Sequence, residues 1–387
     1  MATFAYTSFA QQVIFGEGSL NQLGQATARF GWRQMLLCVT SGARARGGVA
    51  RIEAALGGRL ALTFDGVAPH VPEEMVATAT ALAERADVDA VIGFGGGSAI
   101  GAAKAIASAL ETRRMGHPTP AAYPTDQPLI PVVAIPTTYS GSEMTAVYGV
   151  TREEDGEPRK VTVSDPKIAP KLVLYDPLLT LDLPPRETAG TVINAVAHCV
   201  EALYSTTRNP VSTAAALAGL QAMARALPRL GADGADRVAR AEMLMGAYLA
   251  GTALASVTMA LHHGVCQVIG GATGAAHGDV NGIMLAPVMR FNLEVAAPQL
   301  AQAAEAMGVA DRAGAARDQR AAGMAAAQTV ADLVERLRLP RRLREIGVRE
   351  EQLPGLARAA FASRTVHNNP RPITDVSQIE ALLRAAW

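Results

Sequence analysis

Four of the seven histidines fall in three short segments of the C-terminal half: His198, His262, His263 and His277. His198 follows Asn194 by four residues in a stretch of helical composition, so the two side chains share one helix face. Gln267 follows His263 at the same spacing, and a glycine-broken stretch leads on to His277. Neutral imidazoles from two helices and a loop could converge on one divalent metal ion, of a kind in the range from zinc to iron. Each histidine alone is more typical of a structural residue. Together with the glycine-rich loop described next, the four histidines predict a functional site.

A glycine triplet stands where an apolar run gives way to a helical stretch. The apolar run is 88–94, and the helical stretch is 99–107. Between them lie Gly95, Gly96, Gly97 and Ser98. Glycines let the backbone approach a ligand without Cβ clashes, and the free N–H groups and positive dipole of a helix start point to the same place. The pattern predicts a pyrophosphate site, although glycines also serve ordinary strand-to-helix turns.

A second polar loop follows the apolar run 131–135. Its hydroxyl-bearing residues are Thr137, Thr138, Tyr139, Ser140 and Ser142. Open α/β sheets bind nucleotides at the carboxyl ends of their strands, so this loop is a second candidate for nucleotide binding. The alternative is a turn whose hydroxyl groups satisfy its own backbone.

The pattern of segments changes near residue 185. Before it, short β-rich runs alternate with alanine-rich helical stretches, as in a parallel sheet covered by helices. The expected strands are 35–40, 59–64, 90–94, 132–135 and 172–175. Residues 153–156 have the Asp-Gly chemistry of a hairpin turn, with the β-branched run 161–163 on its far side. After Pro184-Pro185 the residues are mostly helix formers with apolar positions at helical spacing.

This organisation predicts two domains. We expect an α/β dinucleotide-binding domain over residues 1–185 and an all-α domain with the histidine site over residues 186–387. Small-molecule sites commonly lie in the cleft between such domains. With 387 residues, of which 49% are hydrophobic, the chain can bury a large core without disulfides. The three cysteines are far apart, and they are expected to be small buried residues.

The charge balance and the N-terminus exclude several function classes. The formal net charge is zero, so the sequence has no electrostatic footprint for nucleic acid or an anionic membrane. The first residues have neither the basic nor the apolar region of a signal peptide, and no apolar stretch is long enough to cross a bilayer. We expect a cytoplasmic protein with a small-molecule partner and no nucleic-acid or membrane partner.

The residues that could do chemistry resemble those of the iron-containing alcohol dehydrogenases. The matching motifs are Gly95-Gly96-Gly97-Ser98 with Lys104, Ile135-Pro136-Thr137-Thr138 with Gly141-Ser142-Glu143, Asp176-Pro177, His198 with Glu201-Ala202, His263, His277-Gly278 and Asn369-Pro370-Arg371-Pro372. They occur in order, so the resemblance covers nearly the whole chain. It implies an N-terminal dinucleotide-binding domain, a C-terminal helical domain and hydride transfer between them.

Within this family the sequence is most similar to the maleylacetate reductases. The positions of the family's metal ligands, an aspartate and three histidines, hold Asn194, His198, His263 and His277. Gly101 replaces a second acid, and loss of both acids distinguishes maleylacetate reductases from alcohol dehydrogenases. Gln267 stands where a further histidine is usual in both groups, and the sequence around His277 is closer to the alcohol dehydrogenases. The substrate could therefore be a relative of maleylacetate.

The resemblance implies a reaction and a set of site residues. NADH or NADPH would deliver hydride to the C=C bond of maleylacetate, and 3-oxoadipate would form. A metal ion or hydrogen-bond donors must stabilise the charge that develops on the ketone oxygen. The catalytic candidates are His198, His263 and His277. The substrate candidates are Asn194, His262 and Gln267. The cofactor-binding candidates are Ser41, Gly95, Gly96, Gly97, Ser98, Thr137, Thr138, Tyr139, Ser142 and Lys160.

Three further expectations follow from the resemblance. Asn194 offers a neutral amide in place of a carboxylate, so a divalent metal (Fe or Zn) is not expected to be required, although three histidines could still hold zinc. Arg208 or Arg371 could neutralise a substrate carboxylate, but each is also typical of a solvated surface residue. A homodimer is expected.

Cofactor choice depends on the residues after the strand 35–40. An acid there would bind the ribose 2′-hydroxyl of NADH and repel the 2′-phosphate of NADPH. Ser41-Gly42 stands there instead, followed by Arg44 and Arg46. NADPH is therefore expected to be accepted alongside NADH, the alternative being that both arginines point into solvent.

Three other functions fit parts of the sequence. The first is a metal-dependent alcohol dehydrogenase or aldehyde reductase. The second is a lyase like dehydroquinate synthase, but Asn194 and the scarcity of lysine in the C-terminal half argue against it. The third is a binding protein that has lost the chemistry, which cofactor oxidation in the presence of substrate would exclude.

Overall fold

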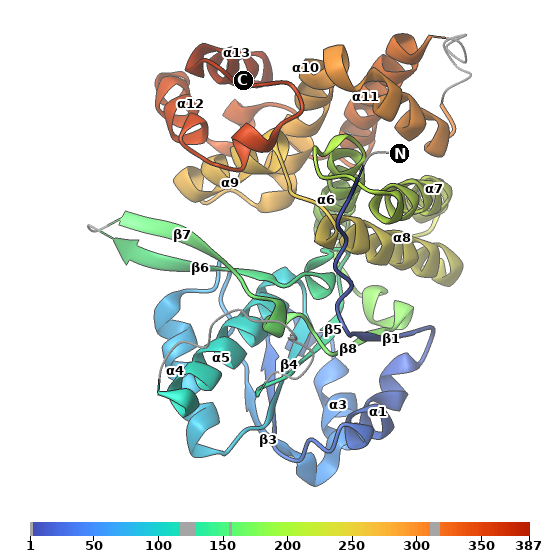
Figure 1. Ribbon diagram of the computed structural model, residues 1–387. Coiled ribbons are helices and arrows are strands. Elements are labelled where there is room, and N and C mark those ends of the chain that lie inside the picture. Colours follow the sequence, from blue (N-terminus) through green and yellow to red (C-terminus); the bar gives the residue numbers. More distant parts are fainter. Residues whose placement is uncertain (1–2, 117–128, 155–156, 310–317) are drawn as a thin grey trace. The chain divides into compact units, whose positions relative to one another are not determined.

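The computed structural model describes residues 3–116, 129–154, 157–309 and 318–387 (Figure 1). The chain divides into two compact units, Ser8–Leu183 and Pro184–Trp387, and residues 3–7 group with the second unit. The sequence pattern put the boundary slightly later, after residue 185, and assigned residues 3–7 to the first unit. The functions assigned to the two units stay predictions.

The first unit is built on a six-stranded parallel sheet with the order β1-β8-β5-β4-β2-β3. Its strands are β1 (Gln12–Phe15), β2 (Met35–Val39), β3 (Leu60–Phe64), β4 (Ala90–Gly95), β5 (Val132–Pro136) and β8 (Leu172–Tyr175). Strands β2, β4, β5 and β8 are buried along their whole length, so they form continuous apolar runs. The five expected strands are confirmed. Strand β1 was missed because it is short and partly exposed.

Helices cover both faces of this sheet. They are α1 (Leu23–Arg29), α2 (Ser41–Ala45), α3 (Gly48–Leu56), α4 (Glu73–Arg85) and α5 (Gly97–Met115). On β2, Leu36 and Cys38 belong to one apolar core with residues of α4 and α5. Met35 and Leu37 belong to another core with residues of α1 and α3. Successive side chains of a strand point to opposite faces, so the sheet separates two cores, as expected of a doubly covered α/β unit.

The predicted hairpin is present beside the main sheet. Strands β6 (Val147–Glu154) and β7 (Glu157–Ser164) pair antiparallel, with Val150 opposite Val161. The predicted turn residues at 155 and 156 lie outside the described residues. In Figure 1 the two strands form a separate ribbon, which confirms an antiparallel excursion from the parallel sheet.

The described residues of the second unit form helices and no strands, which confirms the all-α prediction. Its helices are α6 (Pro185–Tyr204), α7 (Pro210–Ala232), α8 (Arg237–Ala255), α9 (Leu261–Thr273), α10 (His277–Ala306), α11 (Gln319–Arg336), α12 (Leu353–Phe361) and α13 (Val376–Ala386). Sequence determines the helix starts: Asn209 caps α7 by accepting from the N–H groups of Val211 and Ser212, with Pro210 at the first position. None of the described helices combines the length and apolarity needed to cross a membrane.

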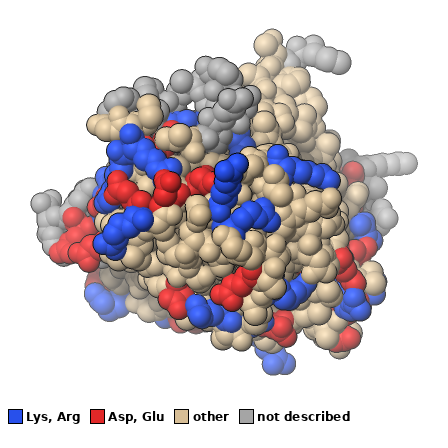
Figure 2. Space-filling view, turned by 90° about the horizontal axis from the view of Figure 1, so that it is seen from below, with Lys and Arg blue, Asp and Glu red and all other residues tan. Residues whose placement is uncertain are grey.

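Basic and acidic side chains lie interspersed on the face of the molecule in Figure 2. Exposed ion pairs among the described residues include Arg113 with Glu84 and Arg114 with Asp87. Such exposed pairs stabilise a fold only slightly. The described part of this face therefore has no continuous basic stripe, and the absence of a nucleic-acid partner stays a prediction.

Candidate active site

The three candidate catalytic histidines lie together in the helical unit. His198 is on α6, His263 is on α9, and His277 is the first residue of α10. The ring centroids of His198 and His263 are 5.0 Å apart, and those of His263 and His277 are 6.4 Å apart. The sequence placed His277 in a glycine-broken loop, which is wrong in part. Helix α9 continues through two glycines to Gly274, whose φ of 67° ends it, and α10 begins soon after.

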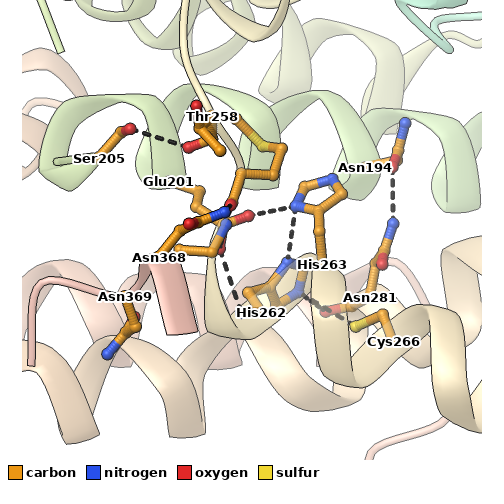
Figure 3. Close-up of polar contacts among 12 residues, drawn as sticks. Asn194, Glu201, Ser205, Thr258, His262, His263, Cys266, Asn281, Asn368 and Asn369 are labelled. Carbon is orange, nitrogen blue, oxygen red and sulfur yellow. Dashed lines mark hydrogen bonds and ion pairs between the residues drawn. The ribbon is translucent and has the colours of Figure 1, made fainter. Parts of the chain in front are cut away.

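Glu201 is the central polar group of this cluster. It is fully buried on α6, and its Oε2 contacts Nδ1 of His263 (Figure 3). Its Oε1 accepts the backbone N–H groups of Ala260 at 3.0 Å and His262 at 3.1 Å. Burial raises the pKa of the Glu201 carboxyl, but the neighbouring His263 outweighs this effect and the pKa is lowered. Glu201 is therefore an anion held by three partners.

The hydrogen bonds of His262 determine which of its nitrogens carries the proton. Burial lowers the pKa of His262 to about 4, so the ring is neutral. Its Nε2 lies 3.2 Å from the carbonyl oxygen of Asn281, which can only accept, so Nε2 carries the proton. Its Nδ1, 3.4 Å from Nδ1 of His263, is then an acceptor. A neutral His263 therefore has its proton on Nδ1, toward Glu201, and a lone pair on Nε2.

Two ring nitrogens of the cluster are buried without a hydrogen-bond partner among the described residues. They are Nδ1 of His198 and Nε2 of His263. Burial lowers the pKa of His198 well below its usual value, and the neighbouring His263 and His277 lower it further. Buried polar atoms in native proteins are nearly always satisfied, so each of these nitrogens is a point where a ligand can bind.

These residues offer a divalent metal only neutral ligands. Asn194 is buried on α6, and its Oδ1 accepts a hydrogen bond from Nδ2 of Asn281 at 2.6 Å. An ion at the family's ligand positions would have three neutral imidazoles and this amide, with no negative charge. A second close group joins Glu201 with His262 and His263, but the hydrogen bonds described above already bring these atoms together.

Two glycines fix how closely α6 and α10 approach beside His277. A Cβ atom added to Gly278 would lie 2.4 Å from Cα and 2.6 Å from the carbonyl oxygen of Gly190. These are backbone atoms, so a side chain at position 278 would force the two helices apart. His277 precedes this contact directly, and its distance from His198 therefore depends on it.

Gln267, a substrate candidate, is exposed on α9. No hydrogen bond or ion pair among the described residues joins it to the histidine cluster. His262, another substrate candidate, is fully buried and bonded to its neighbours, so the structure places it behind His263 as a supporting residue. The substrate role that the sequence gave to His262 stays a prediction.

The glycine triplet of the first unit has the geometry of a close approach to a ligand. Strand β4 ends at Gly95, whose φ is 142°, and α5 begins at Gly97. A Cβ on Gly96 would lie 3.1 Å from Cγ2 of Thr138, so the two polar loops are neighbours. The hydroxyl groups of Thr137 and Thr138 are buried and have no partner among the described residues. They are available to a phosphate at the start of α5.

A pocket of about 130 Å³ lies beside these loops within the first unit. Phe94 and Thr137 line it together with Arg46, Arg51 and Asp182. Arg44, by contrast, pairs with Asp65 at 2.9 Å, and both side chains are exposed. Of the two arginines that bear on cofactor choice, Arg46 is therefore the one at a pocket.

Lys104 holds the hydroxyl-rich loop against α5. It is fully buried, and its Nζ donates to the carbonyl oxygens of Ser142 and Thr145, both at 2.7 Å, and of Val147 at 3.0 Å. Burial lowers the pKa of Lys104 to about 7, although the nearby Glu143 raises it. The motif residue Lys104 therefore positions the hydroxyl-rich loop by binding backbone carbonyl groups.

The remaining cofactor candidates are only partly described. Ser41 is exposed as the first residue of α2, and Ser98 is half-buried in the first turn of α5. Tyr139 is fully buried. The side chain of Lys160 lies outside the described residues, although its backbone belongs to β7.

The two arginines considered for substrate carboxylates differ in their surroundings. Arg371 lies 4.2 Å from the ring centroid of Phe291 and donates to the Phe291 carbonyl oxygen at 2.9 Å. It also pairs with Glu294 at 3.3 Å, so its guanidinium has structural partners. Arg208 is exposed. Neither the contacts of Arg371 nor the exposure of Arg208 supports a role in binding substrate.

Sequence reasoning missed the roles of Glu201 and Asn281. A usable pattern exists for Glu201, which follows His198 by three residues on one helix and so shares its face. Asn281 follows His277 by four residues on α10. A pairing of Asn281 with Asn194 joins two helices and depends on tertiary packing, which no local pattern reveals.

Comparisons with known proteins agree with this arrangement. Residues 10–177 match the family described as iron-containing alcohol dehydrogenase, and residues 188–387 match the C-terminal part of that family. Maleylacetate reductase 1 of Cupriavidus pinatubonensis is 35% identical over 100% of this chain and 98% of its own length. The crystal structure of maleylacetate reductase from Agrobacterium tumefaciens has a TM-score of 0.83 and 32% identity, covering 100% of this chain and 99% of that one.

A solved structure of 1,3-propanediol oxidoreductase is also similar, with a TM-score of 0.90, 28% identity and complete coverage of both chains. The matches therefore extend over both units and include relatives that are named for different activities. The chain belongs to the iron-containing alcohol dehydrogenase family and is an oxidoreductase.

Proposed function

We propose that this protein uses NADH or NADPH to reduce the C=C bond of maleylacetate, or of a related unsaturated oxo acid, to 3-oxoadipate during the breakdown of aromatic compounds. The observation that carries this proposal is the histidine cluster without a carboxylate at its ligand positions. Its Asn194 is committed to Asn281. The similarity to maleylacetate reductases over the full chain supports the same substrate.

The cofactor is proposed to bind to the first unit. The N–H groups at the start of α5 and the hydroxyls of Thr137 and Thr138 would hold its pyrophosphate, and the pocket beside Arg46 would take its adenosine half. When bound, NADH or NADPH supplies a hydride. The residues of the chain bind it, orient it and keep it in place.

The histidines are proposed to stabilise the charge that develops on the ketone oxygen. Hydride adds to the alkene carbon that is β to the ketone, the electron pair of the C=C bond moves toward the oxygen, and a proton adds to the α-carbon. Nδ1 of His198, which lacks a partner, is available to hydrogen-bond this oxygen, and the lone pair on Nε2 of His263 can take up a proton and deliver it to the α-carbon. Glu201 would stabilise a positive charge on His263.

The first prediction concerns substrate and cofactor preference. We expect kcat/KM for maleylacetate to exceed that for short aliphatic aldehydes by at least about a hundredfold, roughly 2.7 kcal/mol of transition-state binding. NADPH should support the reaction within about a hundredfold of NADH, since no acid follows β2 and Arg46 lines the pocket. Oxidation of both cofactors, followed spectrophotometrically, measures all of these values.

Two results would contradict that prediction. A higher kcat/KM for an aldehyde would favour the alcohol dehydrogenase alternative, for which the similarity to 1,3-propanediol oxidoreductase is the supporting observation. No cofactor oxidation with any substrate would favour a binding protein instead.

The second prediction concerns the metal. We expect activity to survive exhaustive chelation, because Asn194 provides no charge to a divalent ion and reduction of an enone generates no alkoxide. Asn194→Asp should newly confer zinc or iron binding, measured by elemental analysis after dialysis. Stoichiometric metal in the unmodified protein, with activity abolished by chelator, would overturn the metal-free mechanism.

A further inference from the structure

The helical unit contains a pocket whose lining includes no histidine. Small residues form its floor, and arginines form its rim. Its volume is about 460 Å³, which is within the usual range for small-molecule sites. Gly282 and Ala286 of α10 and Ala331 of α11 form part of the floor. The hollow exists because these positions have little or no side chain.

A proline also lies along the floor. Ile283 and Pro287 both line the pocket, and they are four residues apart on α10. Proline has no N–H group, so the carbonyl of Ile283 does not receive the usual helical hydrogen bond. The floor is therefore mainly apolar, with one helical hydrogen bond missing along it.

The rim carries four arginines and one acid. Arg290 comes from α10, and Arg341, Arg342, Arg344 and Glu345 come from the segment before α12. Arg341 pairs with Glu335, and Glu345 accepts the backbone N–H of Arg341 at 3.0 Å. The acid at the rim is thus engaged in holding the backbone.

The other three guanidinium groups have neutral partners. Arg290 donates to the amide oxygen of Gln328 at 3.1 Å, and Arg342 donates to the carbonyl oxygen of Ala385 at 3.0 Å. The guanidinium of Arg344 lies 5.6 Å from the ring centroid of Trp387. None of the three is within ion-pair distance of a carboxylate among the described residues. These three guanidinium groups therefore have no ion-pair partner among the described residues, and the lining, with four arginines and one glutamate, carries an excess of positive charge.

We propose that this pocket binds a small organic dicarboxylate with an apolar body. Three guanidiniums from two separate segments can pair with two carboxylates, since each guanidinium presents a planar fork of donors that matches a carboxylate. The floor of glycine and alanine takes the apolar body. Inorganic phosphate would meet the charge but leave the floor uncovered. The proposal is independent of the reaction at the histidine cluster.

The test is calorimetric titration of the full chain with phthalate, an aromatic dicarboxylate. We expect one site per chain with a Kd of roughly 1 mM or below. The double variant Arg290→Gln/Arg344→Gln should bind phthalate at least about tenfold more weakly, since charge-assisted hydrogen bonds are lost. The matched control Arg225→Gln/Arg320→Gln removes the same charge from exposed positions on α7 and α11 outside the lining. It should bind phthalate as the unmodified protein does.

A second variant distinguishes binding in the pocket from nonspecific electrostatic attraction of the anion to the arginines. Ala331→Trp fills the hollow without changing the net charge, and we expect it to abolish phthalate binding. Benzoate and inorganic phosphate should each bind at least about tenfold more weakly than phthalate. Absence of phthalate binding to the unmodified chain would overturn the proposal. The proposal would also be overturned if the control variant bound phthalate as weakly as Arg290→Gln/Arg344→Gln, or if Ala331→Trp still bound phthalate. Phosphate binding as tight as phthalate binding would overturn it too.

Discussion

Glu201→Gln is expected to lower kcat for maleylacetate by about 10- to 100-fold, the usual effect of removing a partner that orients an active-site histidine. The glutamine oxygen can still accept the N–H groups of Ala260 and His262, so the backbone contacts can persist. Its amide nitrogen, however, would donate toward Nδ1 of His263. That contact favours the proton on Nε2, and the lone pair that the unmodified ring presents there is lost.

The matched control is Glu187→Gln, which removes an acid from an exposed position in the first turn of the same helix. It should leave kcat unchanged and cost at most about 1 kcal/mol of helix stability. Nitrogen chemical shifts of the His263 ring, measured by NMR, would report the change of tautomer directly. If Glu201→Gln kept more than half of kcat with an unchanged His263 spectrum, Glu201 would be a structural residue alone.

Gly278→Ala is expected to reduce both stability and activity. The new Cβ would meet the Gly190 backbone at 2.4 Å, so α6 and α10 must separate, which costs about 1–3 kcal/mol as overpacking does elsewhere. His277 would move with the start of α10, and a displacement of about 1 Å can cost roughly a hundredfold in rate. Urea unfolding and kcat/KM for maleylacetate measure the two effects.

Gly271→Ala is the matched control for that substitution. Gly271 is an exposed residue of α9, and a Cβ there would meet nothing within 4 Å. Because alanine restricts the unfolded chain more than glycine does, this variant should be stabilised by about 0.4–1 kcal/mol. Equal stability and activity of the two alanine variants would show that the Gly190–Gly278 contact does not determine the site.

The parallel sheet could be predicted because its central strands are buried on both faces and therefore consist of uninterrupted apolar residues. The edge strand β1 lacks that property and was missed. The histidine positions could be predicted from helical spacing, since residues four apart share a face. The end of α9 could not, because two glycines inside the helix resemble a loop in sequence.

The supporting residues of the site were harder to predict than its histidines. Glu201 and Asn281 act through partners distant in sequence, His263 and Asn194, so their roles appear only when helices are packed. The same holds for Arg44 and Arg371, whose partners Asp65 and Phe291 lie on other elements. Local pattern identifies a residue type that can do chemistry, but the tertiary contacts decide whether it is available.

Helix α10 carries His277 at its first position, Asn281 one turn later and the floor of the arginine-rimmed pocket from Gly282 onward. Its backbone stays helical as far as Ala296, so these groups lie along one helix with a rise of about 1.5 Å per residue. If a dicarboxylate in the pocket changes the affinity of the histidine cluster for its substrate, the substrate must change the affinity for the dicarboxylate by the same factor. Thermodynamic reciprocity thus makes either ligand a reporter of the other.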